Sequence, residues 1–362
     1  MIALQWVKKY MRIGILTHHY VKNYGAFLQM KALYETLREV YPKADIRIVN
    51  FICQEHLWRN IIHVLHYRRK SDTPVIYREK IRQLRTFIRY ECSLPRTDRV
   101  GTAEEIEALG FDLLVFGSDE IWNAADWGYH PLKFGAGFSE KTKRIAYAPS
   151  VGTFFQLSKE SIREGIKGFW RVSGRDGETL DFLKRMHRGD AVRMPDPVFL
   201  YDFDRDLQKE GIEKKPFRYI LIYDCKLTEK QEQQLRAYKD QHGFKLLGAG
   251  DYKKMYDGVT VNLTPYEWVS LFWHADKVIT GTFHGTAFAI KYHRDFAAFP
   301  TERNRIQKVG SLLRDVGMEE RMLSPGEEDK LCSILDRESD FTRADACLNR
   351  MKEEAFKFLS TG

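Results

Sequence analysis

Cysteine is scarce in this chain of 362 residues, and the five cysteines (Cys53, Cys92, Cys225, Cys332 and Cys347) are an odd number at wide spacing. Because no CxxC pair occurs, the sequence offers neither a disulfide framework nor a zinc knuckle. No apolar run approaches the ~18 residues that a membrane helix needs. The first residues also lack the features of a signal peptide. These absences favour a reduced, cytoplasmic protein.

Nucleotide-binding signatures are missing as well. The first predicted strand-to-helix turn, THHYVKNYGAFLQ at 17–29, has no GxGxxG pattern and no Walker lysine. It does place Asn23 and Gly25 just before a helix, where free backbone N–H groups suit an anion. A helix cap with a tight turn explains the same two residues equally well.

The length and the order of the predicted elements indicate two α/β domains. Single cores stop growing near ~250–300 residues, so 362 residues suit two. Strand-like runs alternate with helical ones, which predicts parallel sheets. We expect a Rossmann-like domain over 1–205 and a second over 206–340, facing across a cleft. A helix in 341–362 could pack back on the first domain. Strands are predicted at 11–16, 45–51, 111–117, 144–150, 170–175, 218–225, 244–250, 259–263, 276–282 and 295–300.

Positive charge is concentrated in one segment. The net charge is +8, and residues 56–90 hold nine Lys and Arg against two acidic residues. We interpret about 56–100 as a basic helical insertion in the first domain. A solvated helix pair is the simplest interpretation. Contact with an anionic membrane comes second, and nucleic acid is least favoured.

One histidine ends a predicted strand. In TGTFHGTAF, residues 280–288, the strand gives way to His284 and then to a helix-like run. Histidine titrates near neutral pH and is suited to general acid catalysis. Ligands of doubly wound sheets bind beyond the carboxyl ends of strands, where His284 is expected to lie. The simpler alternative is a structural histidine in the core.

Polar residues follow two other strands. FGSDEIWN at 116–123 brings together Ser118, Asp119, Trp122 and Asn123, which could bind sugar hydroxyls and stack on a sugar ring. Arg175 ends a further strand and suits a carboxylate or phosphate, although a surface ion pair would explain it too. Arg303 and Arg305 follow the last strand and could complete a cationic pocket.

No metal site is predicted. His56, His63 and His66 fall at near-helical spacing in the basic insertion. This spacing alone does not make them a recognisable ligand set.

Six of these stretches occur in an order that resembles the polysaccharide pyruvyl transferase family. They are NYGAFLQ (23–29), GSDEIWN (117–123), SGRD (173–176), DPVFL (196–200), TFHGTAFAI (282–290) and NRI (304–306). The resemblance runs from about residue 12 to about 313. It implies the two-domain GT-B fold and transfer of the pyruvyl group of phosphoenolpyruvate to a sugar, forming a ketal. Phosphoenolpyruvate is then a substrate, and no cofactor is expected.

The resemblance also implies roles for residues. His284 would be the acid that protonates the donor, Arg175 the anion clamp, and Asp119 the group that orients or deprotonates a sugar hydroxyl. Some relatives carry an arginine at the position of Thr282, so a clamp here would come from Arg303 or Arg305. Asn23, Gly25, Ser118, Trp122 and Asn123 would line the cleft.

The resemblance implies a lipid-linked or nucleotide-linked sugar acceptor used in surface polysaccharide assembly, handled at the inner face of the cytoplasmic membrane. Two other classes of function stay open at this point. One is a nucleotide-sugar glycosyltransferase of the same architecture. The other is a non-catalytic protein whose basic segment binds a membrane or a polyanion.

Overall fold

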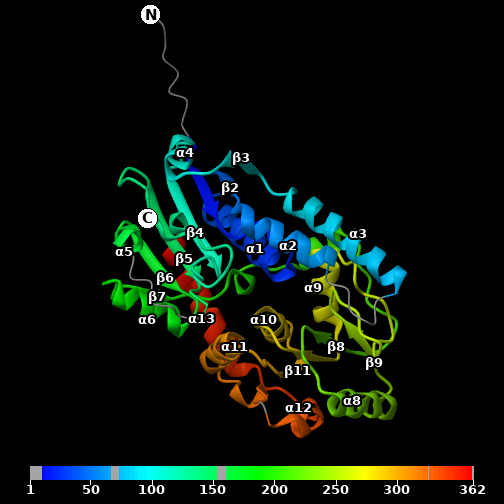
Figure 1. Ribbon diagram of the computed structural model, residues 1–362. Coiled ribbons are helices and arrows are strands. Elements are labelled where there is room, and N and C mark those ends of the chain that lie inside the picture. Colours follow the sequence, from blue (N-terminus) through cyan, green and yellow to red (C-terminus); the bar gives the residue numbers. More distant parts are fainter. Residues whose placement is uncertain (1–9, 67–72, 153–159, 325, 361–362) are drawn as a thin grey trace, which may run out of the picture.

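The computed structural model describes residues 10–66, 73–152, 160–324 and 326–360 (Figure 1). Its first half is built on a seven-stranded parallel sheet with the order β3-β2-β1-β4-β5-β6-β7. This is the order of a doubly wound dinucleotide-binding fold. The strands are β1 (Arg12–Leu16), β2 (Asp45–Phe51), β3 (Arg96–Val100), β4 (Leu113–Asp119), β5 (Lys143–Pro149), β6 (Arg171–Gly174) and β7 (Val192–Arg193).

The second half has a four-stranded parallel sheet with the order β11-β10-β8-β9. Its strands are β8 (Tyr219–Tyr223), β9 (Lys245–Gly248), β10 (Lys277–Thr280) and β11 (Asp295–Ala298). Two parallel α/β sheets confirm the predicted fold class. The strands that the sequence predicted at these places are present, except that 259–263 is not a strand. The short strands β3 and β7 were not predicted.

Helices connect the strands and cover the sheets. They are α1 (Tyr24–Val40), α2 (Gln54–His66), α3 (Pro74–Glu91), α4 (Ala103–Ala108), α5 (Glu160–Lys167), α6 (Gly177–Arg185), α7 (Asp204–Lys209), α8 (Glu229–His242), α9 (Pro265–His274), α10 (Phe283–Lys291), α11 (Arg303–Val316), α12 (Leu331–Asp336) and α13 (Thr342–Leu359). Among the described residues, no helix combines the length and apolar character that crossing a bilayer requires.

Helix α1 is the central helix of the first half, and most of its residues are buried. It begins at the cap residue Asn23, whose side chain accepts a hydrogen bond from the Ala26 N–H at 3.2 Å. Phe27, Leu28 and Leu33 are buried along it, in a core that also includes residues of the second half. The apolar period of 26–40 in the sequence predicts a helix there, and the structure shows that this helix joins the two halves.

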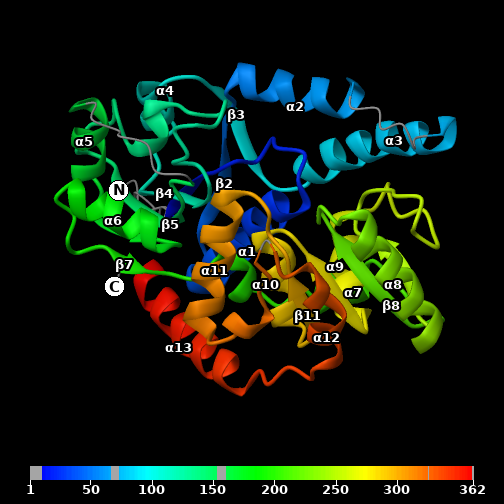
Figure 2. The same cartoon turned by 60° about the horizontal axis from the view of Figure 1, so that its bottom comes forward.

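The basic insertion is a pair of helices, and one of them bridges the two halves. In both views α3 extends from the first sheet over α9 and the second sheet (Figures 1 and 2). The Gln83 amide donates to the backbone oxygens of Gly250 at 3.0 Å and Val261 at 2.7 Å, and Thr86 donates to Asn262 at 2.9 Å. The insertion therefore docks on the second half instead of projecting freely into solvent.

The last helix returns to the first half (Figure 2). Tyr41 donates its hydroxyl hydrogen to the Leu359 carbonyl at 2.8 Å, and Arg171 donates to the Phe358 carbonyl at 2.9 Å. Helix α13 also packs on α11 of the second half, so the chain crosses between the halves at 201–216 and again here.

Candidate active site

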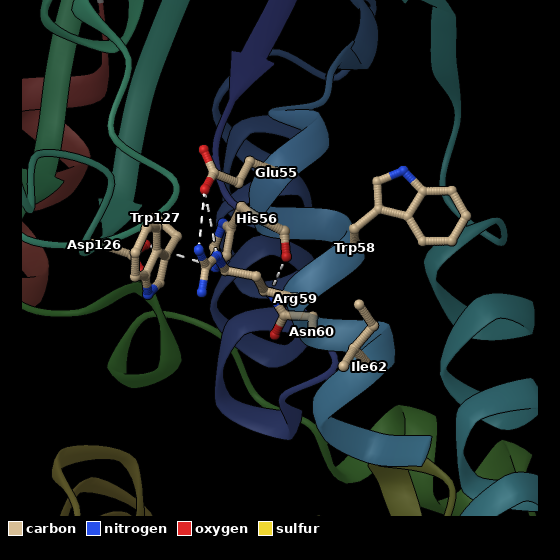
Figure 3. Close-up of a pocket in the computed structure, with 8 residues that line it drawn as sticks. All are labelled: Glu55, His56, Trp58, Arg59, Asn60, Ile62, Asp126 and Trp127. Carbon is tan, nitrogen blue, oxygen red and sulfur yellow. Dashed lines mark hydrogen bonds and ion pairs between the residues drawn. The ribbon is translucent and has the colours of Figure 1, made fainter. Parts of the chain in front are cut away.

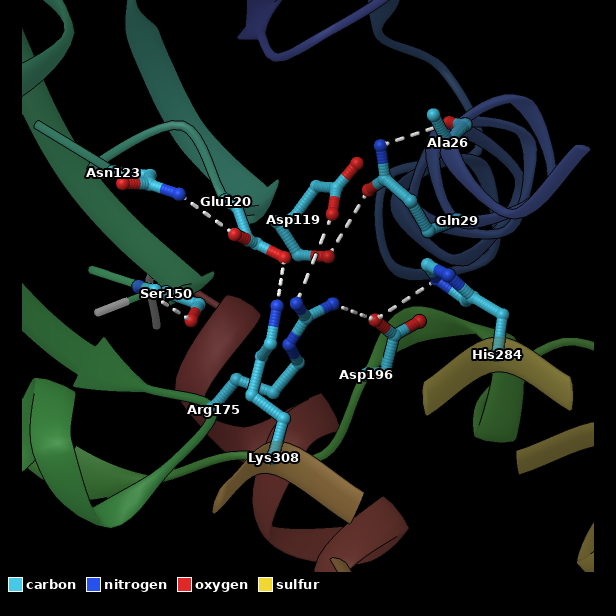
Figure 4. Close-up of polar contacts among 12 residues, drawn as sticks. Ala26, Gln29, Asp119, Glu120, Asn123, Ser150, Arg175, Asp196, His284 and Lys308 are labelled. Carbon is cyan, nitrogen blue, oxygen red and sulfur yellow. Dashed lines mark hydrogen bonds and ion pairs between the residues drawn. The ribbon is translucent and has the colours of Figure 1, made fainter. Parts of the chain in front are cut away.

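His284 lies where the two halves meet. It is the second residue of α10, which begins directly after β10 with Thr282 as its cap. The Thr282 hydroxyl accepts a hydrogen bond from the Gly285 N–H at 3.0 Å. The imidazole is only 13% exposed, and its Nε2 lies 3.6 Å from Oδ2 of Asp196, a residue of the first half (Figure 4). The strand-end position of His284 is therefore as the sequence predicted.

Asp196 is held by Arg175 in a buried ion pair. The Arg175 guanidinium donates from Nη1 to Asp196 Oδ2 at 2.6 Å, and its Nη2 lies 3.7 Å from Oδ1 of Asp119. Burial alone would raise the pKa of Asp196, yet His284 and Arg175 lower that pKa to about 2. Asp196 is therefore ionised near neutral pH. Arg175 and His284 lie beside its carboxylate.

The His284 ring packs against the first turn of α1. A Cβ built on Gly25 would fall far inside contact distance of the imidazole ring, so only glycine allows this approach. Helices α1 and α10 therefore both begin at the junction. Helix N-termini carry partial positive charge and free N–H groups, and both favour an anion. Thr282 contributes as the cap of α10, and Asn23 is the exposed cap of α1.

Two more carboxylates complete the cluster. Asp119 ends β4 in a left-handed conformation with φ of 68°, which aspartate tolerates better than most residues. Glu120 forms an ion pair with Lys308 of α11, which ties the two halves together, and accepts a hydrogen bond from Asn123 at 2.9 Å. Burial opposes ionisation of Glu120, but Lys308 holds its pKa below the usual value.

A model of the polysaccharide pyruvyl transferase family matches residues 23–303, which is most of the chain. The chain belongs to this family of transferases. The resemblance seen in the sequence is thereby confirmed. Among curated proteins, none matches the chain in sequence.

Solved structures that are similar to this family member have the GT-B fold. The UDP-GlcNAc 2-epimerase of Methanocaldococcus jannaschii has 10% identity and a TM-score of 0.51, covering 98% of this chain and 100% of its own. A putative UDP-N-acetylglucosamine 2-epimerase of Listeria monocytogenes follows at 10% identity and 0.48, covering 98% and 91%. A Streptomyces sp. SF2575 glycosyltransferase complexed with thymidine diphosphate has 11% identity and 0.45, covering 96% of each. At such identities the likeness shows the fold alone.

Two residues assigned to the cleft are in the protein interior instead. Trp122 is 0% exposed, stacks on Phe134 in the apolar core, and donates its indole N–H to the Lys133 carbonyl at 2.7 Å. It cannot stack on a sugar. The Ser118 hydroxyl is equally buried and donates to Gln29 Oε1 at 3.0 Å. Both predictions are wrong because Ser118 is a buried residue of β4 itself, and the turn after Glu120 directs Trp122 into the core.

The arginines are arranged differently from the predicted clamp. The Arg175 side chain is 3% exposed and is paired with Asp196 and Asp119. Arg305 is paired with Asp224 at 2.9 Å and with Glu302 at 3.3 Å. Arg303 is exposed at the start of α11 and has no ion-pair partner within the described ranges.

Sequence reasoning missed three charged members of the cluster, Asp196, Glu120 and Lys308. Asp196 begins the DPVFL stretch, which is one of the six stretches of the family resemblance. The sequence therefore marked the position of Asp196 but did not indicate its role. Glu120 stood next to Asp119 in a stretch already singled out. Lys308 lies on α11, three residues beyond Arg305, and nothing in the sequence marked it.

A second polar cluster lies beyond β1. Ligand atoms of His18, His56 and Asp126 all lie within 4.8 Å of one another, so these residues could hold a metal ion. The Lys133 ammonium, however, lies 2.7 Å from His18 Nε2, and its charge opposes a cation there. The sequence missed this group because Asp126 is 70 positions after His56. The side chains of His63 and His66 lie outside the described residues.

Replacing Asp196 with asparagine should destabilise the protein. Asp196→Asn leaves the buried Arg175 charge without its main partner, which costs about 3 kcal/mol in the free energy of unfolding. Because the folded pKa of Asp196, about 2, is below the unfolded one, this stabilisation is complete above about pH 4 and is lost as the pH falls towards 2. Urea unfolding at several pH values measures both effects.

Asp190→Asn is the matched control for this experiment. It also removes an arginine-paired aspartate, but Asp190 is 59% exposed beside Arg188, and a surface pair contributes under about 1 kcal/mol. Equal losses from the two variants would contradict the importance of the buried pair.

Adding one methyl group at Gly25 should separate the two halves. Gly25→Ala would favour the helix by up to about 1 kcal/mol, but its Cβ would displace His284. We expect a lower melting temperature and a larger radius of gyration in solution scattering. Gly310→Ala in α11 is the control, since its Cβ meets nothing closer than 3.5 Å. A Gly25→Ala variant as stable and compact as Gly310→Ala would show that this close approach is unnecessary.

Proposed function

We propose that this transferase moves the pyruvyl group of phosphoenolpyruvate to a sugar of a surface polysaccharide or its precursor, forming a pyruvate ketal. The observation that carries the proposal is the placement of His284. It faces a buried carboxylate and lies where two helix N-termini meet, which combines a proton donor with an anion site.

Asp119, Glu120 and Asp196 bring carboxylates into the cluster, and Arg175 and Lys308 bring cations. Asp196 is the carboxylate that lies beside the His284 imidazole. Asp196 and Arg175 thus act as positioning residues, and His284 is the acid.

The reaction uses these groups in turn. His284 gives its proton to the methylene carbon of the donor, forming a C–H bond, and a sugar hydroxyl attacks the neighbouring carbon, forming a C–O bond. Asp119 takes the hydroxyl proton. A second hydroxyl of the sugar then replaces phosphate at the same carbon, and the leaving phosphate takes the second hydroxyl proton. The N–H groups that begin α1 and α10, with the unpaired Arg303, are suited to bind the donor's carboxylate and phosphate.

A lipid-linked or nucleotide-linked sugar would be the acceptor, and α3 offers a means of binding at the cytoplasmic face of a membrane. Arg78, Arg82, Arg85 and Arg89 recur every three or four residues and are all exposed, so they form one basic ridge. The opposite face of α3 is occupied by the second half through Gln83. Such a ridge is complementary to anionic lipid headgroups.

The first test measures melting temperature with phosphoenolpyruvate and with a panel of nucleoside diphosphates. A ligand at ~100 times its dissociation constant stabilises the folded state by about 2.7 kcal/mol. We expect phosphoenolpyruvate to stabilise the wild type and His284→Asn alike. Only the wild type should release phosphate when methyl glycosides are supplied as acceptors, with the variant slower by at least about 100-fold.

His293→Asn is the matched control, because His293 is half exposed at the other end of the same helix and pairs with Asp345. It should keep full activity. Stabilisation by a nucleoside diphosphate without any response to phosphoenolpyruvate would contradict the proposal and favour glycosyl transfer. Full activity of His284→Asn would remove its role as the acid.

The membrane proposal predicts binding to vesicles containing phosphatidylserine. Arg82→Gln with Arg85→Gln should weaken it by roughly 30-fold, at about 1 kcal/mol for each arginine. Lys230→Gln with Arg236→Gln removes the same charge from the exposed face of α8 and should have little effect. Equal weakening by both pairs, or no binding by the wild type, would contradict a specific ridge. Cosedimentation measures the affinities.

A further inference from the structure

A groove of about 800 Å³ opens beside the second polar cluster and is not used by the reaction described above (Figure 3). One wall is the first two turns of α2, and the other is the loop after β4 that holds Asp126 and Trp127. Sequence positions 55–60 and 126–127 meet here, although some 70 residues separate them.

Trp127 supplies an aromatic surface in this groove. Its indole is 54% exposed, and the Arg59 guanidinium lies 3.3 Å from the centre of one of its rings. Glu55 pairs with Arg59 at 3.2 Å and so holds the stack in place. Arg59 covers one face of the indole, and the remaining exposed part of the ring is apolar surface on which the C–H face of a sugar ring can stack.

Hydrogen-bonding groups lie beside that surface. His56 Nε2 lies 3.6 Å from Asp126 Oδ2, and the His56 carbonyl accepts from the Asn60 amide at 2.8 Å. The lack of a side chain at Gly128 lets the loop lie against the His56 ring. Imidazole, carboxylate and amide groups in one groove are matched to the hydroxyl groups of a saccharide.

The second polar cluster, beside which the groove opens, lies at the same edge of the first sheet as the proposed catalytic cluster. Strands β1 and β4 are neighbours at the point where the strand order reverses, and ligands of this fold bind outside that point. His18 follows β1, Asp119 ends β4, and Thr17 donates to the Ser118 carbonyl at 3.4 Å between them. The Asp119 carboxylate acts electrostatically on His56 and Lys133 on one side and on Arg175 on the other.

We propose that this groove is the acceptor subsite, in which a saccharide ring stacks on Trp127 while His56 and Asp126 hydrogen-bond its hydroxyl groups. The assignment rests on the proposed function, which requires a sugar close to Asp119. The alternative is a divalent metal on His18, His56 and Asp126. The Lys133 ammonium between His18 and the Gly128 carbonyl, 2.7 Å from each, makes the saccharide the better occupant.

Saturation-transfer difference NMR tests the subsite with methyl glycosides of galactose, glucose, mannose and N-acetylglucosamine. At least one should show saturation of its ring C–H protons with the wild type. Trp127→Ala should reduce that signal at least fivefold, and His56→Gln should weaken it without unfolding the protein. Trp170→Ala is the matched control, because Trp170 is 42% exposed and is also stacked by a cation, Lys143, but lies at the start of β6.

An unchanged signal in Trp127→Ala, or no signal from any glycoside, would overturn the proposal. The proposal would also be overturned if the purified protein contained one equivalent of zinc or manganese and His56→Gln lost it. That result would assign the groove to a metal ion. Phosphoenolpyruvate binding is measured separately by melting temperature. If the glycoside signal depends on Trp127 but phosphoenolpyruvate does not raise the melting temperature, the subsite is supported and the proposed donor is contradicted. If phosphoenolpyruvate raises the melting temperature but the glycoside signal does not depend on Trp127, only the subsite is contradicted.

Discussion

The ion pair between Arg175 and Asp196 is the constraint on which the junction of the two halves depends. Neither charge could remain buried alone, because an unpaired ion in the interior costs several kcal/mol. Asp196 follows the last strand of the first sheet, and it contacts Arg175 on its own half and His284 on the other. Through this one carboxylate, the folding of the first half sets the position of a histidine carried by the second.

The sequence predicted what depends on periodicity and strand ends. The strand at 45–51 and the helix ending at 40 lie where predicted, because their apolar residues give a clear signal for each element. His284, Asp119 and Arg175 were found for a related reason, since polar residues directly after buried strands reach one edge of a parallel sheet. Strand β7 has two residues, and no spacing signal can arise from so short a run.

The errors come from contacts made by distant parts of the chain. Trp122 and Asn123 are adjacent, yet one is in the core beside Phe134 and the other bonds Glu120. The sequence of the turn after β4 does not show which of these two side chains points into the core. The carboxylate that faces His56 Nε2 belongs to Asp126, 70 positions later in the chain. Arg175 was expected to bind an anion because its two aspartate partners, Asp119 and Asp196, are far from it in the chain.

Asp119 links the two polar clusters at one edge of the first sheet. Its carboxylate faces Arg175, which belongs to the His284 cluster, and also acts on Lys133, which belongs to the groove. Burial lowers the pKa of Lys133 to about 8, so the groove side carries a cation that is easily neutralised. Asp119 therefore lies between a permanent cation and a weaker one. The left-handed backbone at Asp119 fixes the carboxylate in that position.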